Sequence, residues 1–413
     1  MSWFHPVAGW VLALVWAGHL VDAALGMRRI VDISTPEWDI PEAKLVGLTG
    51  KPALPHVTIV VPARNEELNI EEALHSLIAL DYDNYRIIAV DDRSTDRTGE
   101  IMDGIVSQSN GLLRVLHVRE LPKGWLGKTH AMWLAAGESV EEDQQNRGDD
   151  WILFTDADVV FRSDALRRAI ACAEHERAGH LVLFPTLITR CWDERMMIGF
   201  FHAMFALSQR PWKVSDPDSA DYAGIGAFNL VRRSAYEEIG TYKRLRLAVI
   251  DDMMLGYVLK KNGFEQRNVL GRDLIRLHWA AGALGIVNNL TKNFFAFMRF
   301  NWILAVFACL AVLSINLGPF IGVLSADGWS RWAYVVALVC LALMYVEMNK
   351  RTGISFWYFF LHPVSTMLFS YSILRSTVVT LAQGGIRWRG TMYSLDELRK
   401  GLETEPSVTR QRN

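Results

Sequence analysis

The segment Trp151–Asp158 places the strongest constraint on how this chain can fold. It reads Trp-Ile-Leu-Phe-Thr-Asp-Ala-Asp, an apolar run that ends in two carboxylates. A run of this length and apolarity predicts a strand that is buried on both faces of a parallel sheet. Because side chains alternate along a strand, Asp156 and Asp158 should emerge on one side, where the strand becomes a loop. Open α/β sheets bind their ligands at this edge.

Two carboxylates that point at one place repel each other unless a cation lies between them. A divalent cation such as Mg2+ or Mn2+ prefers oxygen ligands and commonly bridges protein carboxylates to substrate phosphates. An Asp-x-Asp pair also occurs by chance, and on its own it more often marks a solvated loop. The position of the pair after a buried strand favours a metal site at Asp156 and Asp158.

Apolar segments flank a polar central region. Residues 7–27 are long enough to span a bilayer, no Lys or Arg precedes them, and Arg28 and Arg29 follow. This pattern predicts an uncleaved anchor with the N-terminus outside and the chain cytosolic from residue 28 onward. Further apolar stretches lie at 302–324, 331–347 and 355–382. We therefore expect an integral protein of the inner or plasma membrane whose catalytic domain faces the cytoplasm.

The basic tail conflicts with a simple count of membrane crossings. Four crossings that begin outside would leave the tail outside, yet Arg387, Arg389 and Arg399 are typical of the cytosolic side. One C-terminal segment could therefore be re-entrant or kinked. Gly318-Pro319 and His362-Pro363 are the candidate breaks.

The net charge and the cysteines argue against two other kinds of function. Lys plus Arg (43) nearly equal Asp plus Glu (45), so no general affinity for nucleic acid is expected. The four cysteines have no metal-ligand spacing and no reason to pair, so we interpret them as reduced thiols. They are Cys172, Cys191, Cys309 and Cys340.

The region from Val57 to about residue 280 alternates strand and helix patterns. Strands are expected at 57–61, where Pro62 should close the strand, and at 86–90, 114–118 and 151–155. Helices are expected at 70–78, from a cap at Ser94 or Thr95 to about 107, and at 129–140. This order predicts a mostly parallel sheet with flanking helices and right-handed crossovers.

Each of the first four strands brings polar residues to the same edge of the sheet. They are Arg64 and Glu66, then Asp91 and Asp92, then Lys128, and finally Asp156 and Asp158. Any one pair could be a solvated loop charge. The four groups together indicate a nucleotide-binding site.

At this point the chain resembles glycosyltransferase family 2, the inverting enzymes of GT-A fold that use nucleotide-diphosphate sugars. The matching segments are Val60-Val-Pro-Ala-Arg-Asn-Glu66, Val90-Asp-Asp-Arg-Ser-Thr-Asp-Arg-Thr98, Gly127-Lys128, Asp156-Ala-Asp158, Gly224-Ile-Gly226 with Arg232-Arg233, and Ile250-Asp-Asp252. The resemblance implies an α/β, Rossmann-like GT-A domain and an inverting hexosyltransferase that depends on Mg2+ or Mn2+.

The resemblance also implies roles for single residues. The nucleotide sugar, with a UDP-sugar favoured, would be held by Ala63, Glu66, Asp92, Lys128 and Asp156. Asp92 would face the base and Lys128 would lie near the diphosphate. Asp158 is the expected direct metal ligand, with Asp156 beside it.

The catalytic base is expected at Asp252, with Asp251 in place of the family's Glu. An inverting displacement needs a carboxylate on the far side of the sugar to take the proton of the acceptor hydroxyl. A paired carboxylate can raise the pKa of its neighbour, which suits a base. Either residue could cap the helix expected at 253–262, with or without the role of a base. Gly224 and Gly226 would lie on the acceptor side.

The C-terminal part of the chain indicates a lipid acceptor. Residues 283–298 predict an amphipathic helix that lies in the membrane interface. Phe297–Trp302 matches only loosely the Gln/Arg-x-x-Arg-Trp motif of many membrane relatives, which argues against a processive polymer synthase. The architecture resembles ceramide glucosyltransferases and, more closely, hopanoid-associated glycosyltransferases, because the tail contains Arg387-Trp-Arg-Gly-Thr-Met-Tyr393.

These observations predict six segments and one function. The segments are an anchor at 1–30, a Pro- and Gly-rich connector without periodicity at 31–56, the GT-A catalytic domain at 57–280, the interfacial helix at 281–301, a membrane bundle at 302–385 and a basic tail at 386–413. The expected function is transfer of a sugar from a nucleotide-diphosphate sugar to a lipid hydroxyl within the bilayer, as in hopanoid lipid biosynthesis.

Other functions remain open at this point. Within the same reaction class, a polyprenyl-phosphate or ceramide-type acceptor is the alternative. A sugar-nucleotidyltransferase would use a similar sheet and metal carboxylates, but it would need neither Asp252 nor the membrane segments. A non-enzymatic scaffold would be expected to have broken metal or base positions, and none is broken.

Overall fold

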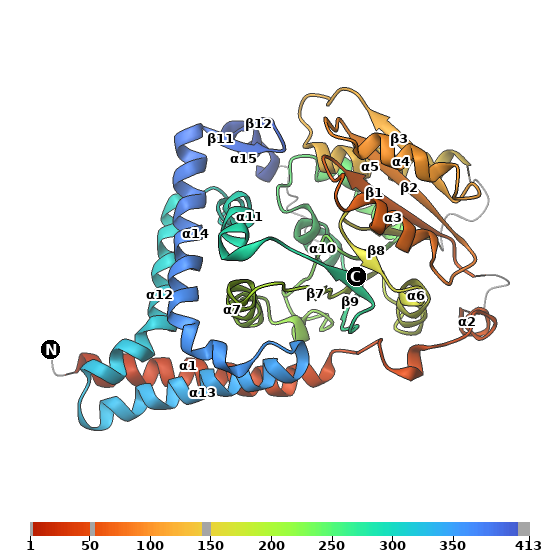
Figure 1. Cartoon of the computed structure of the whole chain (residues 1–413). Helices are drawn as coiled ribbons and strands as arrows, with labels where there is room; N and C mark the ends of the chain where they lie inside the picture. The colour runs from red at the N-terminus through yellow and green to blue at the C-terminus, as the bar shows by residue number, and fades with distance from the viewer. Residues whose placement is uncertain (1–2, 50–53, 143–149, 404–413) are drawn as a thin grey trace, which may run out of the picture. The chain divides into compact units, whose positions relative to one another are not determined.

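The structure, a computed structural model of the chain, describes residues 3–49, 54–142 and 150–403 (Figure 1). The chain divides into two compact units. The apolar unit consists of Met1–Arg29, Thr189–Trp212 and Trp279–Leu395, and the sheet unit consists of Ile30–Ile188, Lys213–His278 and Asp396–Asn413. Residues 189–212 thus belong to the apolar unit, although they lie within the range expected for the catalytic domain.

A seven-stranded sheet forms the centre of the sheet unit. Its order is β3-β2-β1-β4-β8-β6-β9. The bounds are β1 Val57–Ala63, β2 Tyr85–Asp92, β3 Leu113–Val118, β4 Trp151–Phe154, β6 His180–Leu183, β8 Asn229–Arg232 and β9 Gln266–Val269. Strand β1 pairs in parallel with β2 and β4, β2 with β3, and β6 with β9, whereas β8 is antiparallel to β4 and β6. The expected mostly parallel α/β sheet is confirmed.

Strand β4 is the buried strand that the sequence predicts. All four of its residues are at most 2% exposed, and it is paired on both sides. Each buried side chain of this size contributes roughly 1.5–3 kcal/mol through removal of apolar surface from water. The expectation that Pro62 closes β1 is wrong, because β1 continues to Ala63. Strand β4 pairs with β1 only as far as Val60, so the proline lies beyond the part that is paired on both sides.

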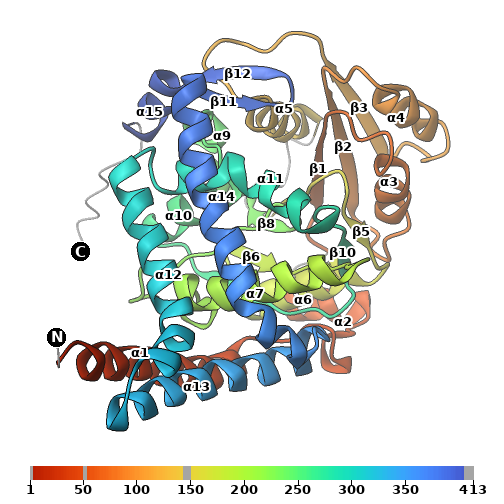
Figure 2. The same cartoon turned by 60° about the vertical axis from the view of Figure 1, so that its left-hand side comes forward.

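Helices cover this sheet (Figures 1 and 2). They are α3 Ile70–Ile78, α4 Thr98–Val106, α5 Gly127–Glu142, α6 Ala165–His175, α8 Arg233–Glu238, α9 Thr241–Arg244 and α10 Asp251–Lys261. A smaller sheet has the order β5-β10-β7, with β5 Val160–Phe161, β7 Thr186–Leu187 and β10 Ile275–Leu277. The cap expected at Ser94 or Thr95 is wrong, because α4 begins at Thr98 after Arg97. The backbone N–H of Ser94 instead donates to the side chain of Asp91 near the end of β2, and that of Thr95 donates to the side chain of Asn65 after β1.

The connector is partly helical and is held by two arginines of α6. It contains a 3₁₀ turn, Pro36–Trp38, and α2, Glu42–Thr49, although its sequence shows no periodicity. Its residues 50–53 lie outside the described part. Arg167 and Arg168 pair with Asp39 at 2.9 and 3.2 Å. Arg168 also donates to the carbonyl oxygens of Ile33 and Thr35. These contacts explain why a Pro-rich segment follows a defined path.

The apolar unit contains four helical segments long and apolar enough to cross a membrane. They are Phe4–Arg29, Trp302–Ser325, Gly328–Thr352 and Phe356–Gln383. The helices of this unit are α1 Phe4–Gly26, α7 Trp192–Gln209, α11 Gly282–Phe297, α12 Trp302–Ser325, α13 Gly328–Thr352 and α14 His362–Gln383, followed by a hairpin of β11 Gly385–Trp388 and β12 Thr391–Ser394. Helix α15, Leu395–Glu403, begins at the boundary of the two units.

The long helices form two pairs that run across each other. Helices α1 and α13 lie side by side with their N-terminal ends together, and α12 and α14 run crosswise to them (Figures 1 and 2). A Cβ atom on Gly9 of α1 would lie 3.1 Å from the Cβ atom of Ala333 in α13. Of the two candidate breaks, Pro319 lies inside α12 without ending it, whereas His362 begins α14 after a 3₁₀ segment, Phe356–Leu361.

Helix α11 confirms the helix expected at 283–298. Its Ala283, Val287 and Leu290 are buried within the protein, whereas Phe297 is 40% exposed. In the described part of the chain all four cysteines are free, in agreement with the reduced state that the spacing indicates.

Candidate active site

Hydrogen bonds tie the turn after β1 to the loop after β2. The Asn65 side-chain oxygen accepts from the Thr95 N–H at 2.8 Å, and the Glu66 N–H donates to the Thr98 hydroxyl at 2.8 Å. Ala63 lies in register with Asp91. The expected nucleotide-binding residues Ala63, Glu66 and Asp92 therefore lie at the same edge of the sheet. Ala63 and Asp92 end β1 and β2, and Glu66 lies in the turn that bonds to the loop after β2.

The carboxylate of Asp92 is buried and paired with two arginines. Arg93 reaches it through Nε at 2.8 Å and Nη2 at 3.0 Å, and Arg64 lies at 3.8 Å. A Cβ atom on Gly127, the first residue of α5, would lie 2.1 Å from Asp92 Oδ2. Glycine is therefore needed for this close approach. In the sequence, only the position of Arg93 next to Asp92 indicates a role for it.

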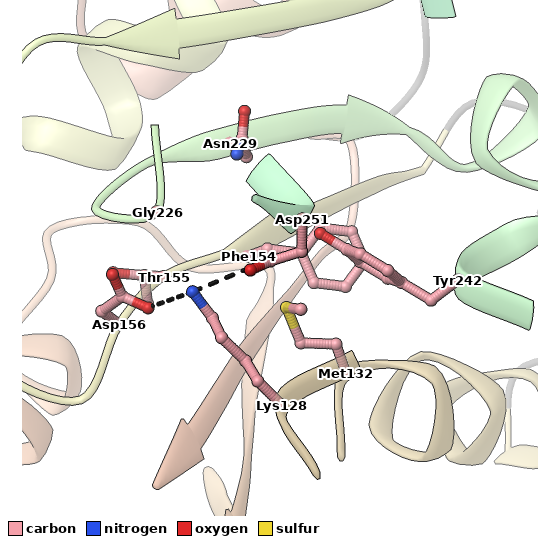
Figure 3. Close-up of a pocket in the computed structure, with 9 residues that line it drawn as sticks. All are labelled: Lys128, Met132, Phe154, Thr155, Asp156, Gly226, Asn229, Tyr242 and Asp251. Atoms are coloured by element: carbon pink, nitrogen blue, oxygen red, sulfur yellow. Dashed lines mark ion pairs between the residues drawn. The ribbon is translucent and has the colours of Figure 1, made fainter. Parts of the chain in front are cut away.

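Lys128 links the metal motif to the second pair of carboxylates. Its Nζ lies 2.7 Å from Asp156 Oδ1 and 3.5 Å from Asp251 Oδ2 (Figure 3). Burial alone would lower the pKa of Lys128, but the charges of Asp156 and Asp251 raise it overall. The Lys128 side chain, from α5, is thus a permanent cation between Asp156, which follows β4, and Asp251, which begins α10. These three residues are far apart in the sequence.

Two carboxyl groups at this edge have strongly raised pKa values. Burial, followed by the charges of Asp156 and Glu66, raises the pKa of Asp158 to about 7. Burial also raises the pKa of Asp251 to about 7, with Asp252 as the main repelling neighbour. The local negative charge exceeds what Lys128 neutralises, so the site favours a further cation.

The donor set fits a hard divalent cation that is shared with a ligand. The described residues contain no group of three His, Cys, Asp or Glu side chains that could hold a metal ion alone. The oxygen donors at Asp156 and Asp158 suit Mg2+ or Mn2+, which commonly complete their coordination with substrate phosphates and water. Gly226 leaves space for this arrangement, because a Cβ atom there would lie 2.4 Å from Asp156 Oδ2.

Asp252 is fixed by two backbone N–H groups. Gly226 N donates to Oδ2 and Met253 N donates to Oδ1, each at 2.8 Å. Helix α10 begins at Asp251, and Ile250 occupies the N-cap position without a side-chain cap bond. The alternative that an aspartate caps this helix is therefore wrong. Both aspartates lie in the first turn, where the orientation of Asp252 depends on the loop that contains Gly226.

Glycines allow the loop 223–226 to pack directly on α10. A Cβ atom on Gly224 would lie 1.9 Å from the carbonyl oxygen of Asp252, and one on Gly256 would lie 1.8 Å from that of Ala223. Neither position has space for a side chain. The expected acceptor-side residues Gly224 and Gly226 therefore hold the expected base in place.

Gly256→Ala is expected to destabilise the protein by roughly 1–3 kcal/mol, because the added methyl group must push α10 away from the loop. The matched control is Gly137→Ala in α5, where a Cβ atom meets nothing within 4 Å. The control should gain about 0.5–1 kcal/mol, since alanine replaces glycine within a helix. Thermal unfolding midpoints of the two variants in mild detergent provide the comparison. Equal shifts would contradict the close packing of this loop.

A small recess brings these groups together (Figure 3). It is lined by Lys128, Met132, Phe154, Thr155, Asp156, Gly226, Asn229, Tyr242 and Asp251. The buried Tyr242 hydroxyl has no hydrogen-bond partner among the described residues. A buried polar atom without a partner is costly, so this hydroxyl is available to a bound ligand. Tyr242 belongs to no sequence motif and was not predicted as a site residue.

Comparisons with known proteins agree with this geometry. Residues 58–240 match the family Glycosyl transferase family 2. The 4,4'-diaponeurosporenoate glycosyltransferase of Staphylococcus aureus (strain USA300) is 25% identical over 349 residues, which cover 83% of this chain and 89% of that protein. The solved mannosyltransferase from Pyrobaculum calidifontis has a TM-score of 0.53 at 16% identity, covering 92% of this chain and 99% of that one. Residues 58–240 thus match the model of glycosyl transferase family 2, and the sheet that they contribute to has the GT-A-like α/β fold of the Pyrobaculum structure.

Proposed function

We propose that this chain is a membrane-bound, inverting glycosyltransferase that transfers a sugar from a nucleotide-diphosphate sugar to a lipid hydroxyl. The observation that carries the proposal is the meeting of Lys128, Asp156 and Asp251 at one recess, with Asp252 oriented beside it. A sugar donor needs cationic groups at its diphosphate and a carboxylate near its anomeric carbon. The candidate membrane helices of the same chain support a lipid acceptor.

The donor side combines a cation site with Lys128. Asp158, with Asp156 beside it, would hold Mg2+ or Mn2+. When bound, the cation neutralises charge on the leaving diphosphate. The Pyrobaculum mannosyltransferase was solved with GDP-Man and Mn2+, which suits the same set of oxygen donors. Lys128 stabilises the charge that develops on the diphosphate as its bond to the sugar breaks.

Asp252 is the base in this proposal. It takes the proton of the acceptor hydroxyl while the acceptor oxygen forms its bond to the anomeric carbon and the diphosphate leaves on the opposite face. The two backbone N–H bonds keep the carboxylate in one orientation. Burial raises the pKa of Asp252, which makes the ionised form a stronger proton acceptor than a solvated aspartate.

The acceptor is a polycyclic or long-chain lipid in the bilayer, and the catalytic domain faces the cytoplasm. Arg28 and Arg29 directly after α1 support this orientation. The S. aureus relative is named for 4,4'-diaponeurosporenoate, which supports a small molecule as acceptor in place of a growing polymer. Hopanoid lipids are the first candidates for this chain, followed by ceramide-like and polyprenyl-phosphate acceptors. A UDP-sugar is the first candidate donor.

The function is tested with the purified full-length protein, a panel of labelled nucleotide sugars and a membrane lipid extract. Label from one donor should enter the organic phase, and mass spectrometry should show one added hexose per lipid. The Asp252→Asn variant is the control for contaminating enzymes. Label that appears only in water-soluble or polymeric product would refute the lipid acceptor.

The raised pKa of Asp158 predicts a pH dependence of metal binding. A ligand carboxylate must lose its proton before it binds a cation, and the pKa of Asp158 in the metal-free protein is about 7. Lowering the pH from 8 to 6 therefore increases competition from protons. We expect the affinity for Mn2+ in the presence of UDP to fall roughly tenfold between pH 8 and pH 6, as for one competing proton of this pKa. Calorimetric titration measures this affinity, and a constant value from pH 6 to 8 would contradict the prediction.

A further inference from the structure

Arg375 of the apolar unit has only neutral hydrogen-bond partners among the described residues. The Arg375 side chain of α14 donates from Nη1 to the Asn288 side-chain oxygen at 2.8 Å and to the Thr291 hydroxyl at 2.7 Å. No carboxylate in the described part of the chain pairs with it. Arg331 in the same unit, by contrast, pairs with Asp327 at 3.2 Å. Arg375 thus brings a positive charge to a candidate membrane helix without a matching negative charge.

The two contacts leave one edge of the guanidinium available. Asn288 and Thr291 lie on α11, which runs beside α14 (Figures 1 and 2). Both bonds use Nη1, so Nε and Nη2 of Arg375 donate to no described residue. These N–H groups form a planar fork that matches two oxygen atoms of a phosphate or carboxylate. The neutral partners fix the direction of the fork and leave its charge unneutralised.

Exposed apolar side chains surround this cation. Those within one helical turn of Arg375 or Asn288 are Leu284 (68% exposed), Tyr371 (52%), Leu374 (42%) and Val378 (63%). Lys292, one turn after Asn288 on α11, lies 4.9 Å from the centre of the Trp388 ring. A half-buried cation with an apolar rim, and with a second cation and a tryptophan nearby, has the chemistry of a site at the membrane interface.

Arg375 lies in the C-terminal half of α14, eight positions before its last residue, Gln383. An arginine with no counter-ion is costly inside hydrocarbon but is stable where it meets a phosphate at the interface. We propose that Arg375, oriented by Asn288 and Thr291, binds the phosphate of an anionic phospholipid headgroup. This site rests on the proposed membrane placement and not on the transfer reaction.

The test measures lipid binding by the full-length protein in mild detergent. Phosphatidylglycerol should raise the thermal unfolding midpoint of the wild type and of Arg331→Gln, the matched control whose arginine is paired with an acid. Arg375→Gln should bind phosphatidylglycerol about tenfold more weakly or worse, because it loses charge-assisted hydrogen bonds. Phosphatidylcholine, which has no net charge, should have no comparable effect on any of the three proteins.

Several outcomes would overturn the site. Equal phosphatidylglycerol affinity in Arg375→Gln and the wild type would exclude Arg375 as the ligand. A full stabilising effect from inorganic phosphate alone would mean that the site takes a free anion and not a lipid. If Arg375→Gln does not fold, Asn288→Ala keeps the charge and should weaken binding about threefold; unchanged affinity would then refute the proposal. Nucleotide binding by these variants should stay normal, which separates this site from the proposed transfer reaction.

Discussion

Replacing Asp252 with asparagine is expected to reduce sugar transfer by roughly a hundredfold or more, the scale for removal of a general base. Binding of the nucleotide sugar should stay near normal, because Lys128, Asp156 and Asp158 are unchanged. The amide can accept a hydrogen bond from only one of the two N–H groups at Gly226 and Met253. We therefore also expect a loss of about 1 kcal/mol in stability.

Initial rates and donor affinity, measured on the same preparation, separate chemistry from binding. The control is Asp218→Asn, which changes an exposed acid of the sheet unit and the same net charge. A parallel loss of donor binding and of transfer in Asp252→Asn would mean that Asp252 supports the loop rather than the reaction.

Asp158→Ala is expected to abolish the part of nucleotide binding that depends on metal. The remaining carboxylate, Asp156, already bonds to Lys128 at 2.7 Å and cannot hold the bridging ion alone. Loss of groups that only support a metal ligand typically costs 10- to 100-fold in affinity, so loss of the ligand itself should cost roughly a hundredfold or more. UDP is titrated with Mg2+, with Mn2+ and with a chelator.

The Asp158→Ala result is compared with Asp218→Ala, which removes an exposed carboxylate of the same unit. The wild type and the control should bind UDP more tightly with either metal, whereas Asp158→Ala should bind it equally with and without metal. A metal effect that persists in Asp158→Ala would place the cation on other residues.

Local patterns were sufficient to predict the parts of the site that follow strands. The apolar run from Trp151 and the two aspartates after it can be recognised from neighbouring residues alone. A strand that is buried on both faces needs apolar residues at every position, and such a run is visible in the sequence. The same reasoning places Glu66 and Asp92 at the shared edge, since parallel strands end together. It also locates the four apolar segments, for which length and composition are enough.

Residues whose roles depend on distant contacts could not be predicted. Tyr242 lines the recess because the chain brings α9 next to it. No residue spacing in the sequence indicates that α9 lies there. Arg93 adopts φ 58° beside Asp92, which depends on how the two loops fit together. Residues 189–212 join the apolar unit although they interrupt the sheet unit in sequence, and hydrophobicity alone cannot distinguish a core helix from a membrane-facing helix.

The side-by-side packing of α1 and α13 bears on how the chain passes through a bilayer. Their N-terminal turns lie together, as the approach of Gly9 to Ala333 requires, so both helices enter a membrane from the same side (Figure 1). Helices α12 and α14 run crosswise to this pair (Figures 1 and 2), so the two pairs cannot both run along one membrane normal. Four apolar helices therefore do not imply four crossings. This removes the conflict between a count of four crossings and the cytosolic character of Arg387 and Arg389.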